Sequence, residues 1–203
     1  ARFLYGQQAT SEVRAAELRT DLTAGGRAGR MAAWSEKVRA ARDPQAVADE
    51  LLPEVYAEVC RAAREVFGWE VFDSQLLAAI AMSRGSVIEL DTGEGKTLVA
   101  VLVACLQALS GRGVHVLTFN DYLAGRDADW MGPVYERMGL RVGVVHPYTG
   151  PTDRRAAYAC DVTYLTAKEA GFDYLRGFLA LGEDEMPQRP LHSAIVDEAD
   201  SIL

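Results

Sequence analysis

A lysine and a threonine at the end of a glycine-containing turn are the residues whose types and spacing most directly indicate chemistry. The segment Val87–Thr97 reads V-I-E-L-D-T-G-E-G-K-T, an apolar run followed by a turn with Gly93 and Gly95 and then a helix start. Glycines let backbone N–H groups approach phosphate oxygens closely, and a helix N-terminus adds partial positive charge. Lys96 would then reach the β- and γ-phosphates, while Thr97 would offer its hydroxyl to Mg²⁺. The segment predicts a P-loop.

Three features of this segment bear on that prediction. Lys96 is one of only three lysines in the chain, the others being Lys37 and Lys168, and it stands where a compact ammonium is wanted. Leu90 departs from the standard pattern, which has a glycine there. Asp91 and Glu94 carry negative charge, so we expect their side chains to point away from the phosphates. The alternative is a glycine turn that binds nothing.

Two adjacent carboxylates form the second candidate. Asp197 and Glu198 end the apolar segment S-A-I-V, and ligands of open α/β sheets bind at the carboxyl ends of strands. Asp197 would hold Mg²⁺ and Glu198 would orient the attacking water or accept its proton. Acid clusters are also common at solvated loop ends. Downstream of a phosphate loop, however, the pair predicts a nucleoside triphosphate hydrolase.

The elements that must position these residues change character along the chain. Residues 11–67 predict three helices, with breaks at Gly25-Gly26, Gly29 and Asp43-Pro44, and the clearest helix beginning near Pro53. Beyond residue 86, five short apolar runs predict a parallel sheet with helices on both faces: Val87–Leu90, Val114–Phe119, Val142–Val145, Val162–Leu165 and Ala194–Val196. The helix beginning at Lys96 is apolar all round, as expected beneath a sheet, and Leu181–Pro190 predicts a loop.

Composition excludes several classes of protein. Hydrophobic residues make up 49% and charged residues 25%, which is ordinary globular usage. Residues 71–203 hold eleven basic and eighteen acidic side chains, a balance that speaks against a nucleic-acid surface. The longest apolar run, Leu98–Leu106, is too short to cross a membrane. Cys60, Cys105 and Cys160 indicate isolated thiols in a reducing compartment, so we expect a cytoplasmic protein.

Other chemically suggestive residues have ordinary structural interpretations. The three histidines, His115, His146 and His192, are unclustered and are interpreted as structural, so no metal beyond Mg²⁺ is expected. Structural ion pairs would explain Arg126 and Arg176 as well as a functional role would, so we leave both out of catalysis. Trp69 and Phe72 could flank a base, but packing explains Trp69 at least as well.

Several motifs resemble those of the SecA family of protein-translocation ATPases. They run from about Trp34 to the last residue; residues 1–33 match loosely. The motifs are Phe72–Leu77 upstream of T-G-E-G-K-T, Thr118–Ala124, Gly171–Arg176 and Asp197–Leu203. The resemblance implies that Gln75 reads adenine, that Gly93, Glu94, Gly95, Lys96 and Thr97 bind phosphates and Mg²⁺, and that Asp197 and Glu198 are the Walker B pair. Asp91 and the stretch Thr166–Ala170 depart from the family pattern and suggest a divergent or accessory member.

The resemblance also implies an architecture and partners. We expect a RecA-like, DEAD-type first nucleotide-binding domain over residues 71–203, truncated after the Walker B pair, with a helical segment over residues 1–70 packed on it. The second motor domain and the preprotein-binding domain would be absent, so ATP would bind weakly and be hydrolysed slowly at best. A full-length motor would engage preprotein and the Sec channel at the inner face of the cell membrane. A nucleic-acid helicase domain and a non-catalytic interaction module remain alternatives.

Overall fold

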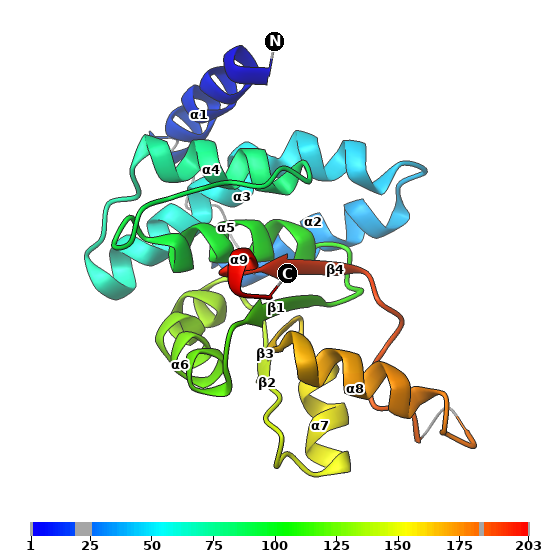
Figure 1. The fold of residues 1–203 in the computed structure, drawn as a ribbon. Helices are drawn as coiled ribbons and strands as arrows, with labels where there is room; N and C mark the ends of the chain where they lie inside the picture. The colour runs from blue at the N-terminus through cyan, green and yellow to red at the C-terminus, as the bar shows by residue number, and fades with distance from the viewer. Residues whose placement is uncertain (1, 19–25, 183–184, 203) are drawn as a thin grey trace.

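Four parallel strands with helices on both faces make up the core of the computed structural model, which describes residues 2–18, 26–182 and 185–202 (Figure 1). The strand order is β2-β3-β1-β4, and every adjacent pair is parallel. The strands are β1 (Val114–Thr118), β2 (Val142–Val144), β3 (Val162–Thr166) and β4 (Ser193–Val196). The helices are α1 (Arg2–Leu18), α2 (Gly26–Ala40), α3 (Pro44–Phe67), α4 (Asp73–Ser83), α5 (Lys96–Ala108), α6 (Asp121–Arg137), α7 (Pro151–Tyr158), α8 (Ala167–Gly177) and α9 (Ala199–Ile202). The predicted α/β class is confirmed.

The three helices predicted before residue 68 are present, but three of their predicted boundaries are wrong, and the first helix begins at Arg2 and not at residue 11. Helix α3 begins at Pro44, because the Asp43 side chain accepts a hydrogen bond of 3.1 Å from the Ala46 N–H and caps the helix. It continues through Pro53, where a start was predicted, to Gly68 at φ 72°. Gly29 lies inside α2 and does not break it. Burial of α3 on its neighbours outweighs the hydrogen bond that Pro53 removes.

The two faces of the sheet bury different side chains because alternate residues point to opposite sides. Val114 and Val116 of β1 and Tyr164 of β3 belong to the larger core, with α3, α5 and α6. Leu165 and Tyr158 belong to a smaller core, with α7 and α8 on the other face. The larger core also includes residues of α1, and the predicted boundary at residue 70 stays a prediction.

Helix α5 lies between a layer of helices and the sheet, as its sequence predicts. It contacts α3 and α4 on one side and β1 and β4 on the other. Every residue from Leu98 to Leu106 is buried. This burial fixes the direction in which the N-terminus of α5 points.

The strand predicted at Val87–Leu90 is wrong. Ile88 and Leu90 pack partly against the larger core, while Val87 is 94% exposed, so the segment alternates as a strand would. It nevertheless pairs with no strand of the described sheet, in which β4 has β1 as its sole neighbour. Alternation reports which side chains are buried, whereas strand formation also requires a partner for the backbone N–H and C=O groups.

Candidate nucleotide-binding site

The predicted phosphate loop forms a tight turn that leads directly into α5. Gly93 and Gly95 have φ values of 91° and 77°, in the left-handed region that glycine adopts without steric cost. Gly95 is the N-cap of α5, and the first turn of a helix leaves backbone N–H groups without partners inside the helix. The turn therefore directs N–H groups and the positive end of the helix dipole to one place, which suits an anion.

Gln75 holds this turn against α4. Its Nε2 donates to the Glu94 carbonyl at 2.8 Å, and its Oε1 accepts from the Phe72 N–H at 2.9 Å. The side chain is buried, and a methyl group on Gly95 would collide with its amide nitrogen. Gln75 thus positions the turn, a contact that the sequence did not predict. Its predicted role as the adenine reader stays a prediction.

The Lys96 ammonium folds back over the turn. Its Nζ donates to the Leu90 carbonyl at 2.9 Å, and the residue is half-buried. Leu90 stands where the standard pattern has glycine, and here its backbone oxygen holds the lysine. A phosphate oxygen can replace this carbonyl as the acceptor, because the four-carbon stem of the lysine is flexible and its ammonium has three N–H donors. Asp91 and Glu94 are exposed at the rim of the turn.

The acid pair has an unusual backbone conformation. The Asp197 N–H donates to the Leu117 carbonyl at 2.9 Å and extends the β4–β1 ladder. Glu198 follows at φ 53°, and among the described residues it is the one non-glycine with a positive φ. Its N–H donates to Asp197 Oδ1 at 3.0 Å. Such strained residues cluster at functional sites, where the surrounding structure maintains them.

Asp127, on α6, lies near the acid pair and was not predicted as part of a site. It is 2% exposed, and burial raises its pKa; the hydrogen bond from Arg126 opposes this shift, and the negative charge of Asp197 adds to it. A sequence signal exists, because Asp127 shares the helical spacing of the buried Ala124 and Met131. An aspartate on a core face needs a partner or a role.

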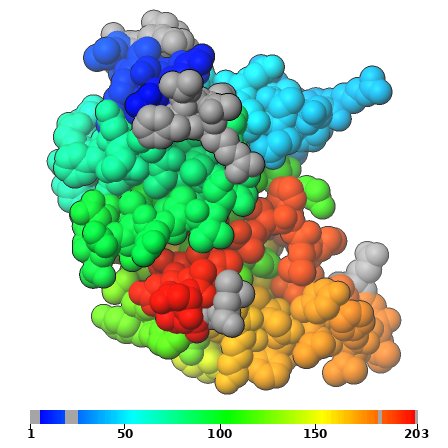
Figure 2. Space-filling model, turned by 45° about the horizontal axis from the view of Figure 1, so that its top comes forward, coloured from blue at the N-terminus to red at the C-terminus, as the bar shows by residue number. Residues whose placement is uncertain are grey.

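The turn and the acid pair lie at one edge of the sheet. Helix α5, which begins at the turn, contacts β4, which ends at Val196, directly before Asp197. Figure 1 shows both at the carboxyl ends of the strands, and Figure 2 shows the red C-terminal segment beside the green part of the chain that leads into α5. This edge is where ligands bind in open α/β sheets.

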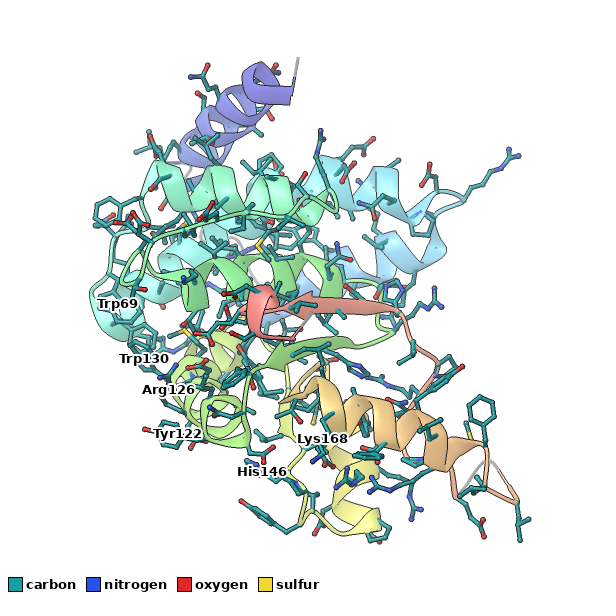
Figure 3. All side chains as sticks on the ribbon, in the orientation of Figure 1. Trp69, Tyr122, Arg126, Trp130, His146 and Lys168 are labelled. Atoms are coloured by element: carbon teal, nitrogen blue, oxygen red, sulfur yellow. The ribbon has the colours of Figure 1, made fainter. Side chains whose placement is uncertain are left out.

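The other candidate residues have structural partners. Arg126 and Arg176 form ion pairs of 2.7 and 2.6 Å with aspartates. Trp69 stacks on Phe67 at 4.4 Å and meets Trp130 edge-on at 5.4 Å (Figure 3). The three cysteines are free thiols. The structural ion pairs considered for the two arginines are therefore present, and the isolated-thiol interpretation of the cysteines is confirmed.

The described residues contain no group of three or more His, Cys, Asp or Glu side chains that could hold a metal ion. Thr97 and Asp197 supply hydroxyl and carboxylate oxygens, the hard donors that Mg²⁺ prefers beside phosphates and water. They fit a metal bound together with a nucleotide. In the same part of the chain, no helix combines the length and apolarity that a membrane crossing requires.

The parallel sheet, the glycine turn before an apolar helix and the strand-end carboxylates together define an α/β domain of the P-loop, RecA-like class. Comparison with known proteins identifies the family: the chain belongs to the SecA DEAD-like domain family, whose model matches residues 7–203. The predicted resemblance is therefore confirmed.

Curated relatives give the same result. Over 155 residues, 76% of this chain, it is 55% identical to the protein translocase subunit SecA of Syntrophomonas wolfei and 54% identical to that of Rubrobacter xylanophilus. It is also 55% identical to protein translocase subunit SecA 2 of Streptomyces avermitilis over the same length. The matched region covers 17–19% of these three relatives, so the chain spans under a fifth of their length.

Proposed function

We propose that this chain is the ATP-binding half of a SecA-type motor that couples ATP hydrolysis to preprotein translocation. One observation carries the proposal: a glycine turn braced by Gln75 opens α5 at the same sheet edge as the acid pair. SecA family membership favours this function over that of a nucleic-acid helicase, and so does the acidic balance of residues 71–203.

The residues of the site would divide the work as follows. Backbone N–H groups of the turn would cradle the phosphates, and Lys96 would exchange the Leu90 carbonyl for a phosphate oxygen. Thr97 and Asp197 would hold Mg²⁺, which when bound neutralises phosphate charge. Glu198 would orient the attacking water or accept its proton.

The chain alone would bind ATP weakly and turn it over slowly at best. In SecA-like motors a second motor domain supplies arginines across the nucleotide, and such residues are worth roughly 10³- to 10⁵-fold in rate. By the same resemblance, the complete motor would bind preprotein and the Sec channel. It would work in the cytoplasm, at the inner face of the cell membrane.

The test is calorimetric titration of the chain with Mg-ATP, comparing Lys96→Ala with Lys37→Ala. Lys37 is an exposed lysine with only a distant ion pair of 4.0 Å to Glu50, which makes it a matched control for the loss of one charge. We expect Lys96→Ala to weaken binding by about tenfold or more, since a charge-assisted hydrogen bond contributes roughly 1.5–3 kcal/mol. Equal affinities in the two variants would refute the proposed phosphate site.

A further inference from the structure

An open hollow of about 650 Å³ lies beside the first half of α6, where β1 and β2 end. Its lining contains none of the predicted nucleotide-binding residues. Two rows of side chains at helical spacing form its α6 wall: Asp121, Gly125 and Asp129 in one row, and Tyr122, Arg126 and Trp130 in the other. Figure 3 shows Tyr122, Arg126 and Trp130 along this helix, with His146 at the end of the neighbouring segment.

The imidazole ring of His146 lies over Gly125 in the first row. A methyl group at this position would lie 3.4 Å from Cε1 of His146, which is ordinary van der Waals contact, so the ring packs closely on this part of the helix. His146 thus forms one side of a depression that Asp121 and Asp129 also line.

Aromatic faces surround this depression and are open to solvent. Tyr122 and Tyr148 are 74% and 83% exposed, and Trp130 is 45% exposed. Tyr148 stacks on His146 with ring centroids 5.1 Å apart and planes 9° from parallel. Exposed tyrosine and tryptophan faces attract cations through their quadrupoles, most strongly when carboxylates stand nearby.

The charge of the hollow favours a cation over an anion. Its lining contributes two carboxylates, Asp121 and Asp129, and one guanidinium, Arg126. Arg126 is already paired with Asp127 at 2.7 Å, so the unpaired charge is negative. A nucleic-acid backbone would meet repulsion here.

Two polar atoms in the wall lack a partner among the described residues. They are Asp121 Oδ1 and His146 Nδ1, and both are buried. Buried polar atoms are nearly always satisfied, so rotation of these two side chains toward a bound group would give each atom the partner that it lacks.

We propose that this hollow binds the guanidinium of an arginine side chain presented by a separate polypeptide. A guanidinium is planar and weakly hydrated, so it stacks on Tyr122, Trp130 or Tyr148 while its N–H groups reach the carboxylates. A lysine ammonium is more strongly hydrated and lacks the flat face, so it fits less well.

The test is a heteronuclear NMR titration of the chain with the peptide acetyl-Gly-Arg-Gly-Arg-Gly-amide. The control peptide carries citrulline, the uncharged isostere of arginine. We expect saturable shifts in the amides of residues 121–130 and 146–148, and binding at least about threefold weaker for the citrulline and lysine peptides. Tyr122→Ala and Asp129→Asn should each weaken binding by at least about threefold.

Tyr174→Ala and Asp153→Asn are the matched controls, because both residues are exposed on other helices, and they should bind the arginine peptide as the parent does. The proposal would be overturned if the citrulline or lysine peptide bound with the same affinity as the arginine peptide, or if the control variants lost as much affinity as Tyr122→Ala and Asp129→Asn. Chemical shift changes confined to other surfaces, or preferential binding of an oligonucleotide at these amides, would also overturn it. Circular dichroism of each variant separates loss of binding from loss of fold.

Discussion

Removing Arg154 should break a buried ionic cluster that ties α7 to α8. Its Nη1 donates to Glu169 Oε2 at 2.8 Å and to Asp173 Oδ2 at 2.6 Å, and its Nη2 donates to the His146 carbonyl at 2.8 Å. Tyr158 also donates to Asp173, at 2.7 Å. Arg154 and Glu169 are each 5% exposed and Asp173 is fully buried, so water cannot replace the lost cation.

The size of the effect follows from this burial. Arg154→Met keeps much of the side-chain volume but leaves two buried carboxylates with only Arg176, whose side chain is half exposed. Breaking a buried pair in this way costs about 3–5 kcal/mol, far more than loss of an exposed pair at about 0–1 kcal/mol. We therefore expect a loss of about 3–5 kcal/mol in the free energy of unfolding.

Urea unfolding at pH 7, followed by far-ultraviolet circular dichroism, measures this loss. Arg155→Met is the control, because Arg155 is the adjacent and more exposed arginine and should cost under about 1 kcal/mol. Adding Asp173→Asn to Arg154→Met should cost less than the two single changes combined, since the second change removes a charge that the first left unpaired. A loss below about 1 kcal/mol for Arg154→Met, or strict additivity, would refute the reasoning.

Three further predictions concern stability and reactivity. Burial acts to raise the pKa of Glu58, but hydrogen bonds from arginines of α2 and α3 outweigh it and leave the pKa below its ordinary value. The ionised Glu58 carboxylate therefore stabilises the fold fully above its ordinary pKa, and this stabilisation is lost as the pH falls through the folded-state pKa. Glu58→Gln should lower the free energy of unfolding by about 1–3 kcal/mol at pH 7 and by less in acid, as measured by urea unfolding at both pH values. Gly143→Ala places a methyl group 2.5–2.9 Å from the α7 backbone, so it should lower the melting temperature and reduce the free energy of unfolding by about 1–3 kcal/mol. Gly171 lies in open space on α8, so Gly171→Ala should raise the melting temperature and increase the free energy of unfolding by about 0.5–1 kcal/mol. Burial raises the pKa of Cys60 to about 12, so titration of the native chain with a thiol reagent should modify the half-exposed Cys160 first; faster modification of Cys60 would contradict its burial.

Local sequence patterns were enough to locate most of the elements. Apolar runs located β1 to β4 to within a residue or two, and the all-apolar stretch after Lys96 located α5. These patterns work because burial on a sheet or between layers repeats along the chain. They were misleading at Val87–Leu90, where the alternation is present without a pairing partner, and at Pro53, where the Asp43 cap had already begun the helix.

Contacts between distant segments could not be predicted in the same way. The hydrogen bond from Gln75 to the glycine turn joins residues nineteen positions apart and depends on how α4 packs on α5. The approach of Asp127 to Asp197 likewise depends on the placement of α6 beside the sheet. Motifs indicated which residues are candidates for the site, whereas packing decided which neighbours hold them.

The outer border of β4 has a consequence for handling the chain in solution. In the part of the chain that the structure describes, this strand is paired on one side only, and its Val196 is 39% exposed. A bare row of amide and carbonyl groups acts as a template for any extended backbone that reaches it. The purified chain should therefore self-associate more strongly as its concentration rises, unless another strand pairs with this edge of β4.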